Sequence, residues 1–273
     1  MSWLSHPRRI VTLVWLGCFA LAGCELIGDR PTSPDQSNID SQTLIHVAKA
    51  AEESGNFSTA VDVLRKGIAA HPSEVRLQIE LGQALYLTGD TEEAIKTFHR
   101  AIELAPGQPD AHILLGRLYL ARHKASEALV EFQAALANDP RQLKALNGKG
   151  IALDLLNRGR EAQESYRAAL ALAPDDRATR SNLGLSLALS GRFDEAIKML
   201  SDVVAEPGAT ARMRQNLSLA LGLKGNLPEA NRIARMDLDE AAAKSNLQYF
   251  DAVRGLAAPG AAGSPPAQTA NQK

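Results

Sequence analysis

Apolar residues at helical spacing come in pairs of stretches, and short polar breaks separate the stretches along most of the chain. One such pair begins with apolar residues from Leu77 to Leu87, breaks at Gly89-Asp90, and resumes from Ala94 to Ile102. Apolar positions at i, i+3 and i+4 indicate one buried face of a helix. Asp90, followed three residues later by Glu93, is typical of a helix start. The pattern predicts a unit of helix, turn and helix.

This unit recurs with a constant step of 34 residues. Three residue types hold the step, namely Ala60, Ala94, Ala128, Ala162, Ala196 and Ala230; Gly82, Gly116, Gly150 and Gly184; and Pro72, Pro106, Pro140 and Pro174. The period predicts about six copies, over residues 41–74, 75–108, 109–142, 143–176, 177–210 and 211–244. A helix of about 14 residues is marginal alone in water. Each unit must therefore pack on its neighbours, which predicts a stack without a central core.

The residue types within the unit predict how its two helices meet. Glycine on the first helix and alanine on the second allow a close crossing. Large side chains of one phase are expected to fill the space beside it: Phe98, Phe132 and Tyr166, with Leu64 and Leu200. The turn inside each unit holds a residue type that tolerates left-handed backbone: Gly55, Gly89, His123, Asn157, Gly191 and Gly225. Pro228 is expected in the first turn of a helix, where its missing N–H costs little.

The amino-terminal segment predicts an export signal over residues 1–23. Arg8 and Arg9 precede an apolar run over residues 10–22. This run is shorter than the about 20 apolar residues of a membrane span, and the charged start is typical of a signal peptide. The run ends in Leu21-Ala22-Gly23-Cys24, which resembles the bacterial lipoprotein lipobox. An ordinary secretory signal with a coincidental cysteine is the alternative.

The lipobox resemblance implies that Cys24 carries the lipid and becomes the mature amino terminus. Residue 25 is Glu rather than Asp. By resemblance to the way enterobacterial lipoproteins are sorted, this implies a location in the outer membrane, facing the periplasm, rather than retention in the inner membrane. Residues 24–40 are polar, contain Pro31 and Pro34, and are expected to form a flexible tether. At the other end, residues 239–257 predict one more helix, which caps the array. Residues 258–273 are rich in Ala, Gly, Pro and Gln, and a disordered tail is expected there.

Composition and motifs indicate no catalytic chemistry. The formal net charge of −1 gives no basic field for nucleic acid. Cys18 and Cys24 have no cysteine partner in the repeats, which excludes a disulfide framework and a cysteine-based zinc site. The six histidines lack metal-site spacing and are expected at the surface or in turns. Neither a nucleophile elbow nor a phosphate loop is present. We expect no enzyme, no cofactor, no metal and no small-molecule substrate.

The repeat resembles the tetratricopeptide repeat (TPR). The residues that carry the likeness are Leu81-Gly82, Ala94, Phe98, Ala101 and Pro106 in one unit, and their equivalents from Leu115-Gly116 to Pro140 in the next. The resemblance implies an all-α solenoid of about six helix-turn-helix units in a right-handed superhelix, with a C-terminal capping helix. It also implies that the first helix of each unit lines a concave face.

Carried over by position, that face holds fourteen candidate groove residues. They are Arg76, Ile79, Gln83, Asp110, Ile113, Arg117, Lys144, Asn147, Ile151, Ser181, Leu185, Arg212, Gln215 and Leu219. The family's clamp for a terminal carboxylate has Lys and Asn where this chain has Ile79 and Gln83, so that ligand is not expected. The mixture of aliphatic and amide side chains suits an apolar peptide or helix. The alternative is that these residues only form solvated helix faces. Asn182 and Asn216 are expected to pack structurally.

A narrower resemblance lies in the last third of the chain. The segments from Arg180 to Gly191, Arg214 to Leu221, Ile233 to Leu238 and Asn246 to Phe250 resemble TadD-like lipoproteins of the tight-adherence (Tad/Flp) pilus system. This implies a periplasmic, outer-membrane-anchored assembly factor, with a secretin or another pilus-assembly component as partner. An envelope adaptor for peptidoglycan enzymes or periplasmic proteases is the alternative, and an enzyme with a cryptic site is a third hypothesis.

Overall fold

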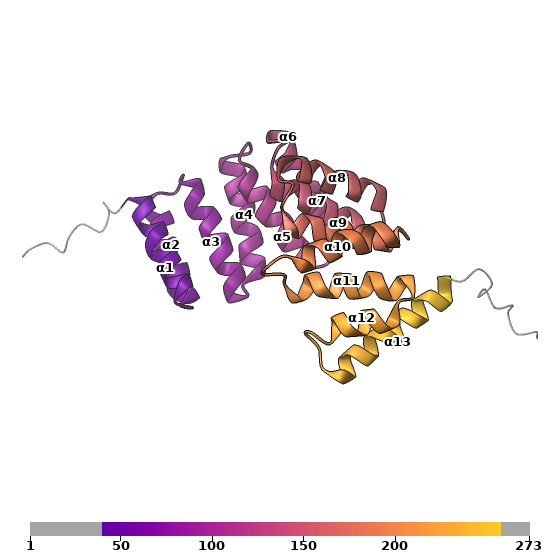
Figure 1. Ribbon diagram of the computed structural model, residues 1–273. Coiled ribbons are helices and arrows are strands. Elements are labelled where there is room, and N and C mark those ends of the chain that lie inside the picture. Colours follow the sequence, from indigo (N-terminus) through magenta and orange to yellow (C-terminus); the bar gives the residue numbers. More distant parts are fainter. Residues whose placement is uncertain (1–39, 258–273) are drawn as a thin grey trace, which may run out of the picture. The chain divides into compact units, whose positions relative to one another are not determined.

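The computed structural model describes residues 40–257, and this part of the chain contains thirteen helices and no strand (Figure 1). The helices are α1 (Ser41–Glu53), α2 (Phe57–Ala70), α3 (Val75–Thr88), α4 (Thr91–Leu104), α5 (Pro109–Ala121), α6 (Ala125–Asn138), α7 (Leu143–Leu155), α8 (Gly159–Leu172), α9 (Arg177–Leu189), α10 (Phe193–Ala205), α11 (Ala211–Lys224), α12 (Leu227–Ala234) and α13 (Glu240–Ala257). The predicted signal peptide, Cys24, the tether up to residue 39 and the tail over residues 258–273 lie outside the described residues.

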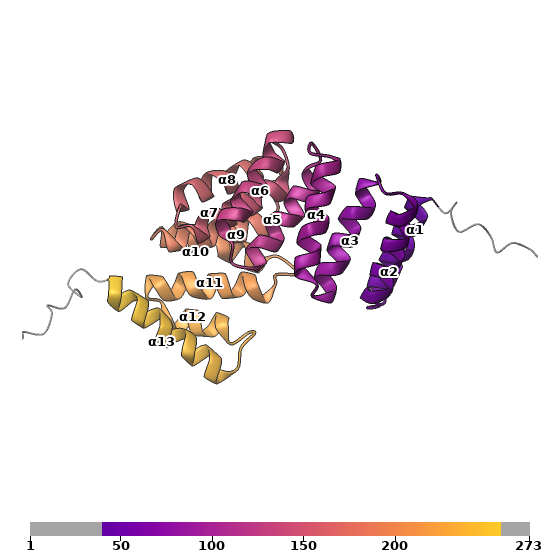
Figure 2. The ribbon, with the colours of Figure 1, turned by 180° about the vertical axis from the view of Figure 1, so that it is seen from behind.

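Each helix from α1 to α12 packs mainly on the helices next to it in the chain, and α13 packs on both α11 and α12. Odd-numbered helices from α1 to α11 are the first helices of six units, and even-numbered helices from α2 to α12 are the second helices. The first helices begin at Ser41, Val75, Pro109, Leu143, Arg177 and Ala211, a step of 34 residues each time. The order along the chain is also the order along the stack (Figure 2). The expected all-α solenoid is confirmed.

The turn inside each unit has the left-handed residue that its sequence predicts. Backbone φ is positive at Gly55, Gly89, His123, Asn157, Gly191 and Gly225. His123 and Asn157, at φ values of 57° and 58°, adopt this conformation without being glycine. A hydrogen bond of the Schellman type closes each turn. Asp90 N–H, for example, donates to the Leu85 carbonyl at 2.9 Å.

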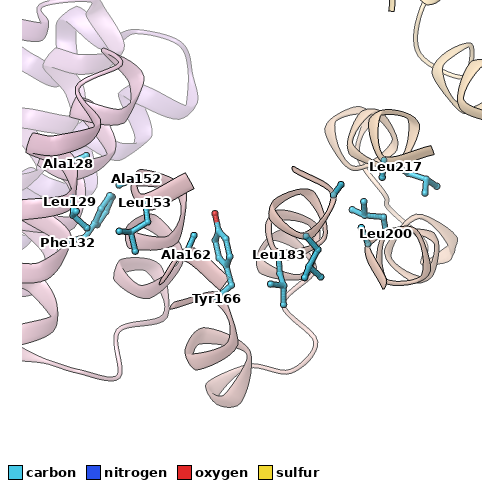
Figure 3. Close-up of a cluster of buried hydrophobic side chains, with 14 of the residues drawn as sticks. Ala128, Leu129, Phe132, Ala152, Leu153, Ala162, Tyr166, Leu183, Leu200 and Leu217 are labelled. Atoms are coloured by element: carbon cyan, nitrogen blue, oxygen red, sulfur yellow. The ribbon is translucent and has the colours of Figure 1, made fainter. Parts of the chain in front are cut away.

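The glycine ladder accommodates a large side chain from the second helix of the same unit. A Cβ added to Gly82 would lie 2.6 Å from the Phe98 ring, and a Cβ added to Gly184 would lie 2.6 Å from Leu200. Gly116 and Gly150 face Phe132 and Tyr166 in the same way. Figure 3 shows Phe132, Tyr166 and Leu200 between the helices of the central and later units. The predicted role of these large side chains is therefore confirmed.

The sixth unit differs from the others in its second helix. α12 has only 8 residues and ends at Ala234, and α13 begins at Glu240, inside the range predicted for this unit. Asp239 caps α13, because its carboxylate accepts a hydrogen bond from Ala242 N–H at 2.8 Å. Phe250 of α13 then fills the space above Gly222 of α11. The added helix thus supplies the large side chain that α12 is too short to provide.

Among residues 40–257, no helix combines the length and hydrophobicity that crossing a membrane requires.

Candidate protein-binding surface

Neighbouring units pack mainly through the second helix of one unit and the first helix of the next, and their first helices also contact each other. Contacts join α1 to α3, α3 to α5, α5 to α7, α7 to α9, and α9 to α11. Within residues 40–257, no two second helices of neighbouring units share a comparable contact. The described stack therefore bends toward the side of its first helices, and a partner lying across that side can touch several units at once.

Two adjoining pockets form one continuous depression over α3 and α5, which we call the α3–α5 depression. Both pockets are lined by Gln83, Leu114 and Arg117. The first pocket, of about 270 Å³, is lined in addition by Arg76, Ile79, Glu80, Gln108, Asp110, Ile113 and Lys144. The second, of about 220 Å³, is lined in addition by Tyr86, Leu87, Phe98 and Leu118. We call them the polar pocket and the apolar pocket.

The polar pocket brings together seven of the fourteen candidate groove residues. They are Arg76, Ile79, Gln83, Asp110, Ile113, Arg117 and Lys144. Ile79 and Ile113 are buried and form its floor, whereas the charged members are exposed. Residues of three first helices, α3, α5 and α7, thus meet at one depression.

The other seven candidates do not line this depression. Arg212 and Gln215 are exposed on α11, and Asn147, Ile151, Leu185 and Leu219 are half-buried. Ser181 is a correction, because it is buried and its Oγ accepts a hydrogen bond from Asn216 Nδ2 at 3.0 Å. A side chain held in this way between α9 and α11 is not available to a ligand. The packing expected for Asn216 is confirmed by the same contact, and Asn182 similarly donates to Asn147 at 3.0 Å.

Of the residues that line the apolar pocket, the sequence identified only Gln83 and Arg117 as candidates. Tyr86 and Leu87 occupy the last turn of α3 and are 45% and 49% exposed. The candidates carried over from the family positions in α3 stop at Gln83, one turn earlier. The signal available was the Leu85-Tyr86-Leu87 run, which has more apolar residues than one buried helix face needs.

Charges in the polar pocket are unbalanced. Glu80 pairs with Lys49 of α1 at 2.8 Å. Arg76 donates to the neutral Gln42 side chain at 3.0 Å. Within the described part of the chain, Arg117, Lys144 and Arg76 form no ion pair with a carboxylate.

His112 contradicts the expectation that every histidine lies at the surface or in a turn. It is 8% exposed within α5, and its Nδ1 lies 2.7 Å from Glu131 Oε2 of α6. The pair joins the two helices of one unit, at a position where the family usually has an aromatic side chain. Across residues 40–257, no group of three or more His, Cys, Asp or Glu side chains is arranged to hold a metal ion.

A second polar cluster joins α7, α8 and α9 around Asp154. Tyr166 donates its hydroxyl hydrogen to Asp154 at 3.0 Å, and Ser186 donates its own at 2.7 Å. Burial raises the pKa of the Asp154 carboxyl, and the two hydrogen bonds oppose that rise. Burial, together with the nearby Asp154 charge, raises the pKa of the Tyr166 hydroxyl. Two hydroxyl donors and one carboxylate acceptor thus hold the three helices together. None of these residues lines either pocket of the α3–α5 depression.

Comparisons with known proteins agree with this geometry. One model described as Tetratricopeptide repeat matches residues 48–109 and 156–211, and a second with the same description matches residues 89–150. Together they cover more than half of the chain. No curated protein matches the chain.

Solved structures share the fold at low sequence identity. The structure of the APC/C hetero-tetramer Cut9-Hcn1 has a TM-score of 0.65 at 19% identity over 77% of this chain, which spans only 43% of that one. A tetratricopeptide repeat protein from Parabacteroides merdae ATCC 43184 has a TM-score of 0.64 at 16% identity, covering 80% of this chain and 86% of that one.

A third structure, YrrB, is described as a TPR protein with an unusual peptide-binding site. Its TM-score is 0.54 at 22% identity, covering 68% of this chain and 97% of that one. At these identities the likeness concerns the fold alone. The models and the architecture together show that the chain belongs to the tetratricopeptide repeat family, whose helical arrays are scaffolds suited to protein–protein interaction.

Proposed function

We propose that this protein is a non-enzymatic scaffold of the bacterial cell envelope, anchored to the outer membrane through Cys24, which binds a protein partner at the α3–α5 depression. We further propose that it assists assembly of a Tad/Flp-type pilus or its secretin. The observation that carries the binding role is the depression itself, in which side chains from three first helices converge.

The layout of the depression favours a polypeptide. Its two pockets, of about 220 and 270 Å³, lie side by side along two helices. Polar and apolar walls adjoin along α3 and α5, so a peptide or helix crossing them could place successive side chains in each. Fixed polar groups at one end would orient such a segment.

The envelope location rests on the sequence at Leu21-Ala22-Gly23-Cys24. One acyl chain gives only marginal membrane binding, whereas several chains on one cysteine anchor a protein firmly. The Tad/Flp role rests on the resemblance of the last third of the chain to TadD-like lipoproteins.

A photocrosslinking experiment tests the partner. Tyr86→p-benzoylphenylalanine places a reactive aromatic ring in the apolar pocket, and the same residue at Lys96, on the exposed side of α4, serves as the matched control. We expect the secretin or another pilus component to crosslink from position 86 and not from position 96. Recovery of peptidoglycan enzymes or proteases in its place would overturn the pilus role and establish the adaptor alternative.

Cys24→Ser tests the anchor separately. We expect the variant to lose palmitate labelling and to leave the membrane fraction, because the serine hydroxyl cannot replace the lipidated thiol. A variant that keeps both properties would contradict the proposed location without touching the binding role.

A further inference from the structure

We propose that the α3–α5 depression selects a partner segment that presents an acidic side chain close to a bulky apolar side chain. This inference rests on the proposed function in one respect, since it takes the depression as the place where the partner binds. It goes further in naming the chemistry that the partner must have.

The apolar pocket provides the first half of this selectivity. Tyr86 and Leu87 are large and half-exposed on one wall, while Leu114 and Leu118 of α5 form the other. Phe98 of α4 is buried behind them and closes the floor. An apolar side chain entering here would remove these surfaces from water, which is favourable in proportion to the area covered. A serine of the partner at the same position would cover little apolar surface and would gain little binding free energy.

The polar pocket provides the second half, through charge. Its cations are Arg76, Arg117 and Lys144, none of which has a carboxylate partner in the described part of the chain. Glu80 is already neutralised by Lys49, so Asp110 is the one lining carboxylate left to oppose three cations. The pocket therefore keeps a net positive charge.

Several arginines elsewhere in the array have the carboxylate partner that these three cations lack. On the second helices and the turns, arginines are commonly paired with carboxylates. Arg65 binds both oxygens of Glu93 at 2.7 and 2.9 Å, and Arg158 binds Glu161 at 2.6 and 2.8 Å. Complementary charge across an interface gives specificity and speeds association. A partner carboxylate is thus the group that the unpaired cations of the depression favour.

Arg117 determines how close the two partner groups must be. It lines both pockets, as do Gln83 and Leu114. A guanidinium binds a carboxylate through two parallel hydrogen bonds, so a carboxylate on Arg117 lies at the border of the apolar pocket. The acidic and apolar side chains must then be neighbours in the partner, either next to each other or within one helical turn.

The carboxylate is assigned to a side chain rather than to a chain terminus. The unpaired cations come from α3, α5 and α7, which are the first helices of three successive units. A segment that crosses these helices passes over the cations with its interior residues. Probe peptides are therefore amidated at the carboxyl end, so that only a side chain can supply the acid.

A set of synthetic peptides tests the inference on the purified full-length protein. Each amidated peptide carries one Phe and one Glu in a background of Gly, Ser and Ala. The position of the Glu relative to the Phe differs from peptide to peptide and covers the nearest positions on both sides. Matched peptides have Lys in place of Glu, or Ser in place of Phe. We expect the best Phe and Glu peptide to bind at least about tenfold more tightly than both matched peptides, and added salt to reduce that margin over the Lys peptide.

Three variants assign the selectivity to residues. Arg117→Glu should reverse the preference for Glu over Lys. Leu87→Ser should reduce the preference for Phe over Ser and leave the charge preference in place. Lys96→Glu makes the same charge change on the exposed side of α4, away from the depression, and should alter neither. Unfolding curves of the three variants show whether each is folded.

Failure of this inference can be told apart from failure of the proposed function. Equal binding of Glu and Lys peptides, or an unchanged charge preference in Arg117→Glu, overturns the inference while the scaffold role stands. A further peptide has Lys in place of Glu and a free carboxyl end. If it binds more tightly than the amidated Phe and Glu peptide, the depression recognises a chain terminus, and the inference is overturned. If no peptide binds, the photocrosslinking experiment decides between the outcomes. When Arg117→Glu is added to the protein with the photoreactive residue at position 86, an unchanged yield of crosslinked partner overturns the inference, and a lost yield supports it. No crosslink at all removes the proposed function from this surface.

Discussion

The residue at one position of the first helix depends on the side chain that faces it. In the second to fifth units a glycine meets Phe98, Phe132, Tyr166 or Leu200. In the sixth unit the residue equivalent to these is Ala234, and the ladder position is Ser218 instead of glycine. The Ser218 hydroxyl donates to the Ala230 carbonyl at 2.8 Å, so the space left by the small partner is used by a hydrogen bond.

Gly150→Ala is predicted to destabilise the protein by about 1–3 kcal/mol, the usual cost of overpacking a core. The new Cβ would lie within 2.7 Å of Tyr166 Cδ1 and Cζ. The ring is fully buried and its hydroxyl is held by Asp154, so it cannot move away. Urea unfolding measures the change. Gly107→Ala is the control, because its Cβ would have Asn138 Oδ1 as nearest neighbour at 3.9 Å, and a loss of equal size there would refute the steric explanation.

Asp154 predicts an unusual dependence of stability on pH. Its folded pKa is raised above the ordinary 3.8, so at pH values between the two the native state binds more protons than the unfolded state. The Asp154 contribution to stability therefore falls as pH rises through this interval. Relative to Asp154→Asn, the wild type should lose stability as pH increases from about 4 to neutrality. Unfolding of both proteins across this range measures the difference, and a constant difference would show that burial does not perturb Asp154.

At the scale of helices, the end of the array is built differently from its interior. α12 is short, and α13 packs against both α11 and α12. Phe250 of α13 is 4% exposed and sits against Gly222, whereas its neighbour Tyr249 is 61% exposed. α13 therefore contributes a core side chain in addition to covering the end of the stack.

Phe250→Ala is predicted to cost about 3–5 kcal/mol in the local stability of α11 to α13, as expected for truncating a buried phenylalanine. Hydrogen exchange resolved along the chain should show faster exchange in these helices and little change in α1 to α4. The matched variant Tyr249→Ala removes an exposed ring and should stay within about 0.5 kcal/mol of the wild type. Equal effects of the two variants would mean that α13 is not packed as described.

At the scale of the whole array, contacts link each unit only to its neighbours. Stability is then approximately a sum of unit and interface terms. Hydrogen exchange of the unmodified protein should be slowest in α5 to α10, which have units on both sides, and faster in α1 and α13. Uniform protection along residues 40–257 would instead indicate a single cooperative unit.

Periodic features of the fold could be predicted from the sequence, whereas contacts that do not follow the period could not. The left-handed backbone at His123 and Asn157 could be predicted because the equivalent turn positions of the other units are glycine. A backbone conformation shared by all units restricts which residue types occur there. The pairing of His112 with Glu131 depends on two helices meeting, and no spacing along the chain encodes it. A capping helix over residues 239–257 was predicted, but the contact of its Phe250 with Gly222 was not, because Phe250 lies outside the phase of the earlier large side chains.

The candidate surface was predicted only in part, for a similar reason. Positions carried over by period identified Arg76, Arg117 and Lys144, which converge at one depression. They could not identify Tyr86, because an exposed aromatic side chain in one unit has no counterpart in the others. The selectivity that we propose for the depression rests on such differences between units.

The position of the α3–α5 depression near the amino-terminal end of the array has a mechanical consequence. A pulling force applied between residue 40 and an occupant of the depression would pass through α1, α2 and α3 and into α5. The helices from α8 to α13 would lie outside this load path and would stay relaxed. Tension would therefore be borne by the first two or three units, and the packing of the later units would not depend on it.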